Sequence, residues 1–184
     1  MMKELIEKTI ATEQVFNGRM IDLQIDTVSL PNGATATREI IRHPGAVAIL
    51  AITADKKMIF VEQYRKPIDR VIFEIPAGKI DAGEIEHLLT AQRELEEETA
   101  YRAANWQLLT ALYTAPGFAD EIIHIYEARG LARQEAPLAM DVDEFLNVHT
   151  LTLTEAKALI GEGKIVDAKT VYAIQHFELN YNNY

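Results

Sequence analysis

The sequence contains no cysteine and only one serine, Ser29. The absence of cysteine excludes disulfide bonds, thiolate metal sites and cysteine nucleophiles. Because Ser29 lies beside a predicted turn and outside any G-x-S-x-G motif, a serine hydrolase of that type is excluded too. No run reaches 18 apolar residues, and the charged start MMKELIEKTI lacks the apolar core of a signal peptide. We therefore predict a cytoplasmic protein that does not cross a membrane.

Positive charge is also scarce, since 18 lysines and arginines face 28 acidic residues, giving a formal net charge of −10. Duplex nucleic acids and anionic membranes require surplus basic residues, so neither is an expected partner. An acidic protein can still bind an anionic small molecule if a divalent cation lies between them. The 184 residues, 48% of them hydrophobic, suffice for one domain with its own core.

The spacing of apolar residues predicts several strands, with helices between or after them. Strands are expected over about 14–29, 35–43, 45–53, 58–65, 71–75, 106–113, 121–128 and 145–151. Helices are expected over about 85–99, from Thr154 onward, and over about 167–179. This order favours an α+β fold in which helices cover a mixed β-sheet.

The stretch RELEEETAY, residues 93–101, places four glutamates within five residues. On a helix, Glu94, Glu97 and Glu98 lie on one face. Like charges at this spacing repel, and the helix dipole disfavours negative charge in the C-terminal turns. A hard cation such as Mg²⁺, which prefers carboxylate oxygens, would remove both penalties. The alternative interpretation is a solvated acidic helix face.

The longer segment GKIDAGEIEHLLTAQRELEEETAY resembles the Nudix box, G-x5-E-x7-R-E-U-x-E-E-x-G-U, where U is aliphatic. The matching positions are Gly78, Glu84, Arg93, Glu94, Leu95, Glu97 and Glu98. There are two departures: eight residues rather than seven separate Glu84 from Arg93, and Ala100 replaces the final glycine. If the backbone at Ala100 is left-handed, alanine costs on the order of 1 kcal/mol there.

Further segments are similar to the ADP-ribose pyrophosphatase branch of the Nudix family: REIIRHPGAVAIL, VEQYRKPIDRVIFEIPAGK, YTAPGFADE, DVDEF and DAKTVYAIQ. The resemblance implies a Nudix domain over residues 44–184, preceded by an antiparallel β extension over residues 1–43. It also implies a homodimer in which these extensions are exchanged. The implied reaction is the hydrolysis of ADP-ribose to AMP and ribose 5-phosphate, with Mg²⁺ as cofactor and Mn²⁺ as the alternative metal.

The same resemblance implies roles for individual residues. The metal ligands would be the Ala77 carbonyl, Glu94 and Glu98, with Glu97 beside them. Arg93 would hold these carboxylates by charge-assisted hydrogen bonds. The substrate would be bound by Arg38, Glu39, Arg65, Phe16 and Glu121.

The general base would come from the acidic loop DVDEF, residues 141–145. Asp143 is the first choice and Glu144 the second, while Glu97 or Glu98 could act instead. A loop acid is more often simply solvated, so the choice among these residues stays open.

Two other functions remain to be separated from ADP-ribose hydrolysis. One keeps the chemistry but changes the substrate to another nucleoside diphosphate sugar or to a dinucleotide. The other is a sensor that binds ADP-ribose without cleaving it. The intact carboxylates and the absence of a basic DNA-binding segment disfavour the sensor.

Overall fold

The computed structural model describes residues 5–81, 83–140 and 144–181. Contacts within the chain divide it into two compact units. The first unit comprises Met1–Gly45 and Tyr113–Ile122, and the second comprises Ala46–Leu112 and Ile123–Tyr184.

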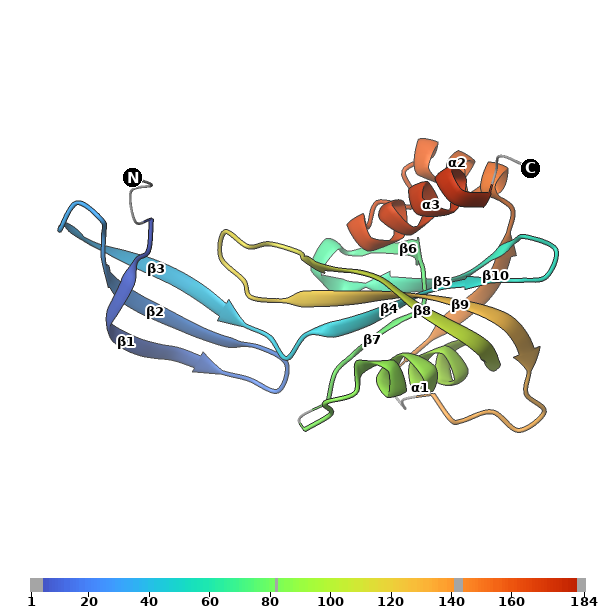
Figure 1. Cartoon of the computed structure of the whole chain (residues 1–184), viewed down its shortest axis with the longest axis horizontal. Helices are drawn as coiled ribbons and strands as arrows, with labels where there is room; N and C mark the ends of the chain where they lie inside the picture. The colour runs from blue at the N-terminus through green and yellow to red at the C-terminus, as the bar shows by residue number, and fades with distance from the viewer. Residues whose placement is uncertain (1–4, 82, 141–143, 182–184) are drawn as a thin grey trace. The chain divides into compact units, whose positions relative to one another are not determined.

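The first unit contains a three-stranded antiparallel sheet in the order β1-β2-β3 (Figure 1). Its strands are β1 (Lys8–Asn17), β2 (Asp22–Ser29) and β3 (Thr35–Arg42). The single strand predicted over about 14–29 was wrong, because a turn separates β1 from β2. In that turn the Gly18 amide donates to the Ile21 carbonyl at 3.0 Å. The predicted turn after Leu30 is present, and Gly33 adopts a φ of +83° there.

The second unit contains a mixed sheet in the order β10-β5-β4-β9-β8. In this sheet β4 pairs in parallel with β9 and antiparallel with β7, while β5 pairs antiparallel with β4, β6 and β10. A short 3₁₀ helix, Lys66–Ile68, joins β5 to β6. The strands are β4 (Ala46–Ile52), β5 (Met58–Arg65), β6 (Arg70–Glu74), β7 (Ala77–Lys79), β8 (Tyr101–Tyr113), β9 (Ile122–Arg133) and β10 (Leu146–Leu151).

Helices cover both faces of this sheet, as Figure 1 shows. Helix α1 (His87–Thr99) packs on one face, and α2 (Leu153–Gly161) and α3 (Ala168–Tyr181) pack on the other. The predicted α+β fold with a sheet between helices is therefore confirmed. The predicted start of α2 at Thr154 was wrong, because Thr152 caps this helix in a capping box with Glu155.

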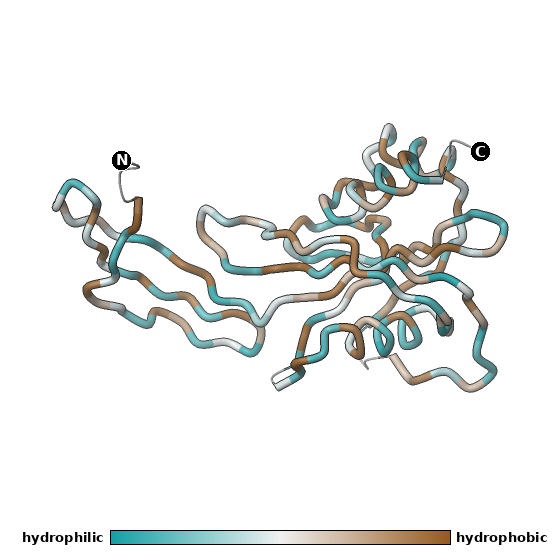
Figure 2. Tube along the Cα trace, viewed as in Figure 1, coloured by the Kyte–Doolittle hydropathy of each residue, from teal (hydrophilic) through white to brown (hydrophobic). Residues whose placement is uncertain are grey.

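Two apolar clusters form the core of the second unit, one on each face of the sheet. They arise because successive side chains of a strand point to opposite faces. In β4, Val47 and Ile49 join the cluster under α1, while Ala48 and Leu50 join the cluster under α3. Figure 2 shows this concentration of hydrophobic residues in the central strands. None of the helices in the described ranges is long and apolar enough to span a membrane.

Candidate active site

Two glutamates on the inner face of α1 are buried, Glu94 with 8% and Glu98 with 3% of its surface exposed. Burial raises the pKa of Glu94 to about 7, assisted by the charges of Glu97 and Glu144 and opposed by Arg93. Burial likewise raises the pKa of Glu98 to about 8, assisted by the charges of Glu144 and Glu94. Both carboxylates therefore require a positive neighbour to be fully ionised at neutral pH.

The backbone of β7 lies directly against these carboxylates. The Ala77 amide donates to Glu98 Oε2 at 3.0 Å. A Cβ atom at Gly78 would lie only 1.9 Å from Glu94 Cδ. The glycine that opens the Nudix box is thus required by the close approach of the Glu94 carboxylate to the backbone.

Arg93 joins the acidic residues of α1 to one another. Its Nη1 atom lies 2.9 Å from Glu94 Oε1 and 2.8 Å from Glu97 Oε2. Its Nη2 atom lies farther from the acids of the preceding loop, 3.6 Å from Asp81 and 3.9 Å from Glu84. These contacts hold Glu97 beside Glu94 despite the repulsion between the two carboxylates.

Glu84 remains next to α1 although the box contains one additional residue. Its Oε2 atom accepts from Thr90 Oγ1 at 2.8 Å and from the Asp81 amide at 3.1 Å. Helix α1 is continuous from His87 to Thr99, so the additional residue lies in the loop between Glu84 and the start of the helix. The acids of α1 consequently keep their helical spacing.

Ala100 ends α1 in a left-handed conformation with a φ of +60°. Its amide donates to the Glu96 carbonyl at 2.8 Å. The condition for a conformational cost at this position is therefore met, since alanine is less stable than glycine in this region.

Two further charged residues lie close enough to interact with the buried glutamates. Glu144 raises the pKa of both Glu94 and Glu98, and Arg65 lowers that of Glu98. The Arg65 side chain donates from Nε to Glu74 Oε2 at 2.6 Å. The other predicted base, Asp143, lies outside the described residues.

The donor set suits a hard cation, because it combines carboxylate oxygens with backbone groups of β7. Within the described ranges, however, no three acidic or histidine side chains are arranged so that they alone could hold a metal ion. Arg93 occupies Glu94 Oε1, and the Ala77 amide occupies Glu98 Oε2. A metal at this position would therefore need the backbone carbonyl or water as additional ligands.

Four predicted substrate-binding residues belong to the first unit. Arg38 binds Glu7, with Nε 2.9 Å from Glu7 Oε2. Glu39 pairs with Ile25 across the β2–β3 ladder, and Phe16 on β1 is 54% exposed. Glu121 accepts from Thr114 Oγ1 at 2.6 Å. The fifth residue, Arg65, belongs to the second unit together with the acids of α1.

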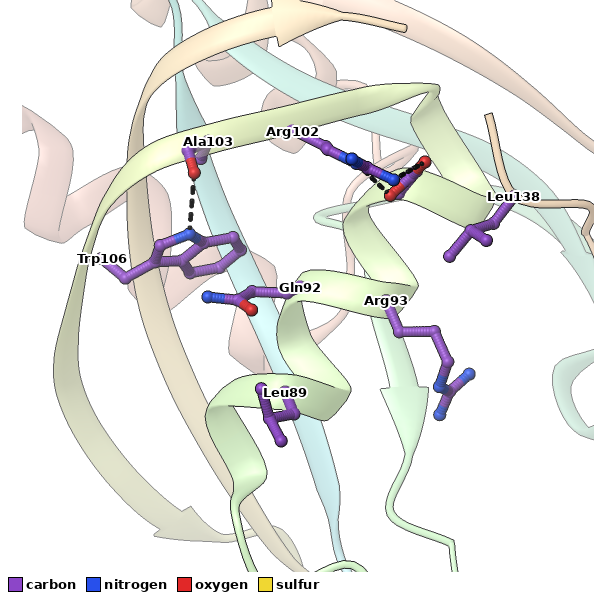
Figure 3. Close-up of a pocket in the computed structure, with 8 residues that line it drawn as sticks. Leu89, Gln92, Arg93, Arg102, Ala103, Trp106 and Leu138 are labelled. Atoms are coloured by element: carbon purple, nitrogen blue, oxygen red, sulfur yellow. Dashed lines mark hydrogen bonds and ion pairs between the residues drawn. The ribbon is translucent and has the colours of Figure 1, made fainter. Parts of the chain in front are cut away.

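A pocket of about 420 Å³ lies on the other side of α1, beside β8 (Figure 3). Trp106 forms one wall, and its Nε1 atom donates to the Ala103 carbonyl at 3.2 Å. Arg102 binds both carboxylate oxygens of Glu96, at 2.6 and 2.9 Å. Figure 3 shows Arg93 pointing away from Trp106. The charged side chains that line this pocket are thus already engaged in ion pairs.

Residues 42–173 of the chain match the NUDIX domain. The chain belongs to the Nudix family. Nudix ADP-ribose pyrophosphatases depend in general on divalent metal ions.

Several relatives of this Nudix protein are similar over most of their length. The chain is 53% identical over 178 residues to the ADP-ribose pyrophosphatase of Bacillus subtilis (strain 168), covering 97% of this chain and 96% of the other. It is 54% identical over 173 residues to the methanol dehydrogenase activator of Bacillus methanolicus, covering 94% and 93%. It is 38% identical over 168 residues to the ADP-ribose pyrophosphatase of Mycobacterium tuberculosis (strain ATCC 25618 / H37Rv), covering 91% and 81%.

A solved structure supports the fold. The crystal structure of an ADP compounds hydrolase superimposes with a TM-score of 0.82 and covers 97% of both chains. Because the two sequences are only 21% identical, this likeness concerns the fold alone.

Proposed function

We propose that this protein is an Mg²⁺-dependent ADP-ribose diphosphatase that hydrolyses ADP-ribose to AMP and ribose 5-phosphate. The main structural support is the pair of buried carboxylates, Glu94 and Glu98, packed against the backbone of β7 with raised pKa values. The choice of ADP-ribose is supported by the relatives named ADP-ribose pyrophosphatase, at 53% and 38% identity.

Glu94, Glu98 and the Ala77 carbonyl would hold Mg²⁺, or Mn²⁺ in its place, with Glu97 beside them. The bound metal would neutralise the negative charge that develops on the diphosphate oxygens during hydrolysis. Arg93 keeps the carboxylates in place through its bonds to Glu94 and Glu97. Arg65 would bind the diphosphate, a role favoured by its proximity to Glu98.

Glu144 or Asp143 would accept the proton of the attacking water. The electrostatic effect of Glu144 on both Glu94 and Glu98 supports a base from this loop. Glu97 and Glu98 remain alternative bases, and a variant series separates them. Loss of the true base should lower kcat more than it raises KM, because the proton is transferred only during the reaction.

Arg38, Glu39, Phe16 and Glu121 would bind the substrate. The protein would be a cytoplasmic homodimer in which residues 1–43 are exchanged and help to build the partner's substrate site. Residues 44–184 would form the Nudix domain of each subunit. The support for a partner is the exposure of apolar side chains on and near β1, including Ile10 at 61% and Val15 at 50%. Sedimentation velocity of the full chain would test the dimer, since a monomer at micromolar concentration would contradict it.

Two relatives each suggest another candidate function. The GDP-mannose pyrophosphatase of Yersinia enterocolitica serotype O:8 / biotype 1B (strain NCTC 13174 / 8081) is 32% identical over 146 residues, covering 76% of this chain and 75% of the other. The similarity to this relative favours another nucleoside diphosphate sugar as substrate. The methanol dehydrogenase activator, at 54% identity, favours a role in activating a dehydrogenase. Adding the protein to a methanol dehydrogenase assay would test that role directly.

A substrate panel tests the main proposal. With Mg²⁺, we expect AMP release from ADP-ribose to be faster than cleavage of GDP-mannose and other nucleoside diphosphate sugars. Equal or slower release from ADP-ribose would favour the alternative substrates.

The variant Glu98→Gln tests the metal seat. It keeps the shape of the side chain but removes its charge, so turnover should fall by at least about 100-fold while the fold is retained. Glu135→Gln, at an exposed acid outside the site, is the matched control. Near-normal turnover by Glu98→Gln would remove Glu98 from the site.

A further inference from the structure

A network of four charged side chains links the start of α3 to Arg65 at the end of β5. Glu74, at the end of β6, accepts from Arg65 Nε on Oε2 and from Lys169 Nζ on Oε1, both at 2.6 Å. Lys169 Nζ also lies 3.0 Å from Asp167 Oδ2. The ion pairs therefore run without a gap from Asp167 through Lys169 and Glu74 to Arg65.

The central members of this network are buried. The side chains of Glu74 and Lys169 are 4% and 9% exposed, whereas that of Arg65 is 40% exposed. The two acids and two bases balance in charge, so no net charge is buried. Because each buried group depends on its partner, removal of one member leaves the next without compensation. The network therefore gives Arg65 a rigid anchor on the protein side while its outer part reaches solvent.

The start of α3 also holds the backbone that leads to the proposed metal site formed by Ala77, Glu94 and Glu98. Thr170 Oγ1 donates to Asp167 Oδ2 and accepts from the Ile75 amide at 3.0 Å. Two residues after Ile75, the Ala77 amide donates to Glu98 Oε2. One turn of α3 thus supports both Arg65 and the segment of β7 that faces the buried glutamates.

The contact with Glu74 determines which hydrogen-bond donors of the Arg65 guanidinium remain available. Glu74 occupies only Nε of the guanidinium. Within residues 5–81, 83–140 and 144–181, neither Nη atom of Arg65 donates a hydrogen bond. Paired guanidinium donors match the oxygens of a phosphate group. The anchored arginine therefore keeps its terminal nitrogens available for an anion.

We propose that Glu74 and Lys169 are positioning residues that aim the terminal nitrogens of Arg65 at the diphosphate of the substrate. The inference rests on the proposed diphosphatase function, but it concerns the diphosphate rather than the identity of the sugar. Without Lys169, Glu74 loses one of its two cationic partners and no longer holds Arg65 in this orientation. Arg65 was predicted from the sequence, whereas Glu74 and Lys169, which lie 9 and 104 positions away in a strand and a helix, were not.

A double-mutant cycle between Arg65 and Lys169 tests this inference. The variants are Arg65→Ala, Lys169→Met and their combination, assayed on the compound of the substrate panel that the wild type cleaves fastest. We expect Arg65→Ala and Lys169→Met each to raise KM by about tenfold or more, with a smaller change in kcat. Because Lys169 acts through Arg65, the double variant should resemble Arg65→Ala alone.

Lys157→Met is the matched control, because Lys157 also forms an ion pair between helices, with Glu178 at 2.7 Å, but lies outside the network. It should leave KM unchanged. If Lys169→Met does not fold, Glu74→Gln replaces it in the cycle, since it keeps the shape of the side chain and removes its charge. Lys169→Arg keeps the charge and should restore part of the affinity.

Multiplicative effects of the two substitutions on KM would overturn the inference, because Lys169 would then act independently of Arg65. An unchanged KM in Lys169→Met would overturn it as well. If the wild type cleaves another diphosphate compound faster than ADP-ribose, the proposed substrate fails while the cycle still tests the positioning role.

Discussion

Asp26 of the first unit and Glu94 and Glu98 of the second unit are all buried, but their pKa values are shifted in opposite directions. In the first unit, Asp26 accepts from Thr12 at 2.7 Å, from Gln24 at 2.8 Å and from Thr9 at 3.1 Å. The bond from Thr12 makes the largest contribution to lowering its pKa. In the second unit, burial raises the pKa of Glu94 and Glu98. The charge of the Asp26 carboxylate is stabilised by hydrogen-bond donors of the fold itself, whereas Glu94 and Glu98 would be stabilised in their charged form by a bound cation.

The two units also differ in how they are stabilised. The second unit has apolar clusters on both faces of its sheet. In the described part of the first unit, the only buried side chains are those of Asp26 and Val28. A three-stranded sheet with so little apolar burial gains little stability from a core of its own. This difference agrees with the proposed exchange of the N-terminal segment in a dimer.

The largest expected effect tests the close packing around the acids of the second unit. In Gly78→Ala, the new Cβ would collide with Glu94, so the carboxylate must move away from β7. We expect kcat to fall by about 100-fold or more, since small displacements of catalytic groups have effects of this size. Gly161→Ala is the control, because a Cβ there would meet no atom within 4 Å. Equal activity of both variants would contradict the described geometry.

The pH dependence of stability should reveal the raised pKa values of Glu94 and Glu98. Glu94 and Glu98 bind protons more tightly in the folded state, so their contribution is complete below the ordinary glutamate pKa of 4.5 and is lost as pH rises through about 7 and 8. We expect the Tm of the metal-free protein to fall over this range, corresponding to at least about 1 kcal/mol. Added Mg²⁺ should reverse the loss by binding the ionised form. A Tm independent of both pH and Mg²⁺ would argue against a cation seat.

The donors around Asp26 can be tested with Asp26→Asn. The amide keeps the shape but replaces one acceptor oxygen with a donor and removes the charge, so at least one of the three donors loses its acceptor and the others lose a charged one. We expect faster hydrogen exchange of the β1 amides, with unchanged exchange in α1. Glu13→Gln, at an exposed position of β1, should have no such effect. Unchanged exchange in Asp26→Asn would show that these bonds do not stabilise the first unit.

The smallest expected effect concerns the end of the acidic helix. Ala100→Gly removes the cost of a left-handed alanine and should stabilise the protein by about 1 kcal/mol, or roughly 2–4 °C in Tm. Activity should be unchanged, because the acids of α1 are not altered. Ala91→Gly, within the same helix, should instead destabilise the protein. Thermal unfolding of the two variants should therefore give shifts of opposite sign.

The sequence by itself determined the Nudix box and the helical spacing that puts Glu94 and Glu98 on one face. It also determined most strands and helices, because apolar residues recur with the period of each element. The position of β1 and the cap of α2 were predicted less well, since exposed strands and helix ends leave weak apolar patterns.

Only the tertiary structure decided which of these residues act together. Burial, which raises the pKa of Glu94 and Glu98, depends on the strands packed under α1. The location of the additional box residue in a loop, and the link from Lys169 through Glu74 to Arg65, likewise depend on contacts between segments distant in the sequence. A local pattern records the period of one element, whereas desolvation and ion pairing arise where several elements meet.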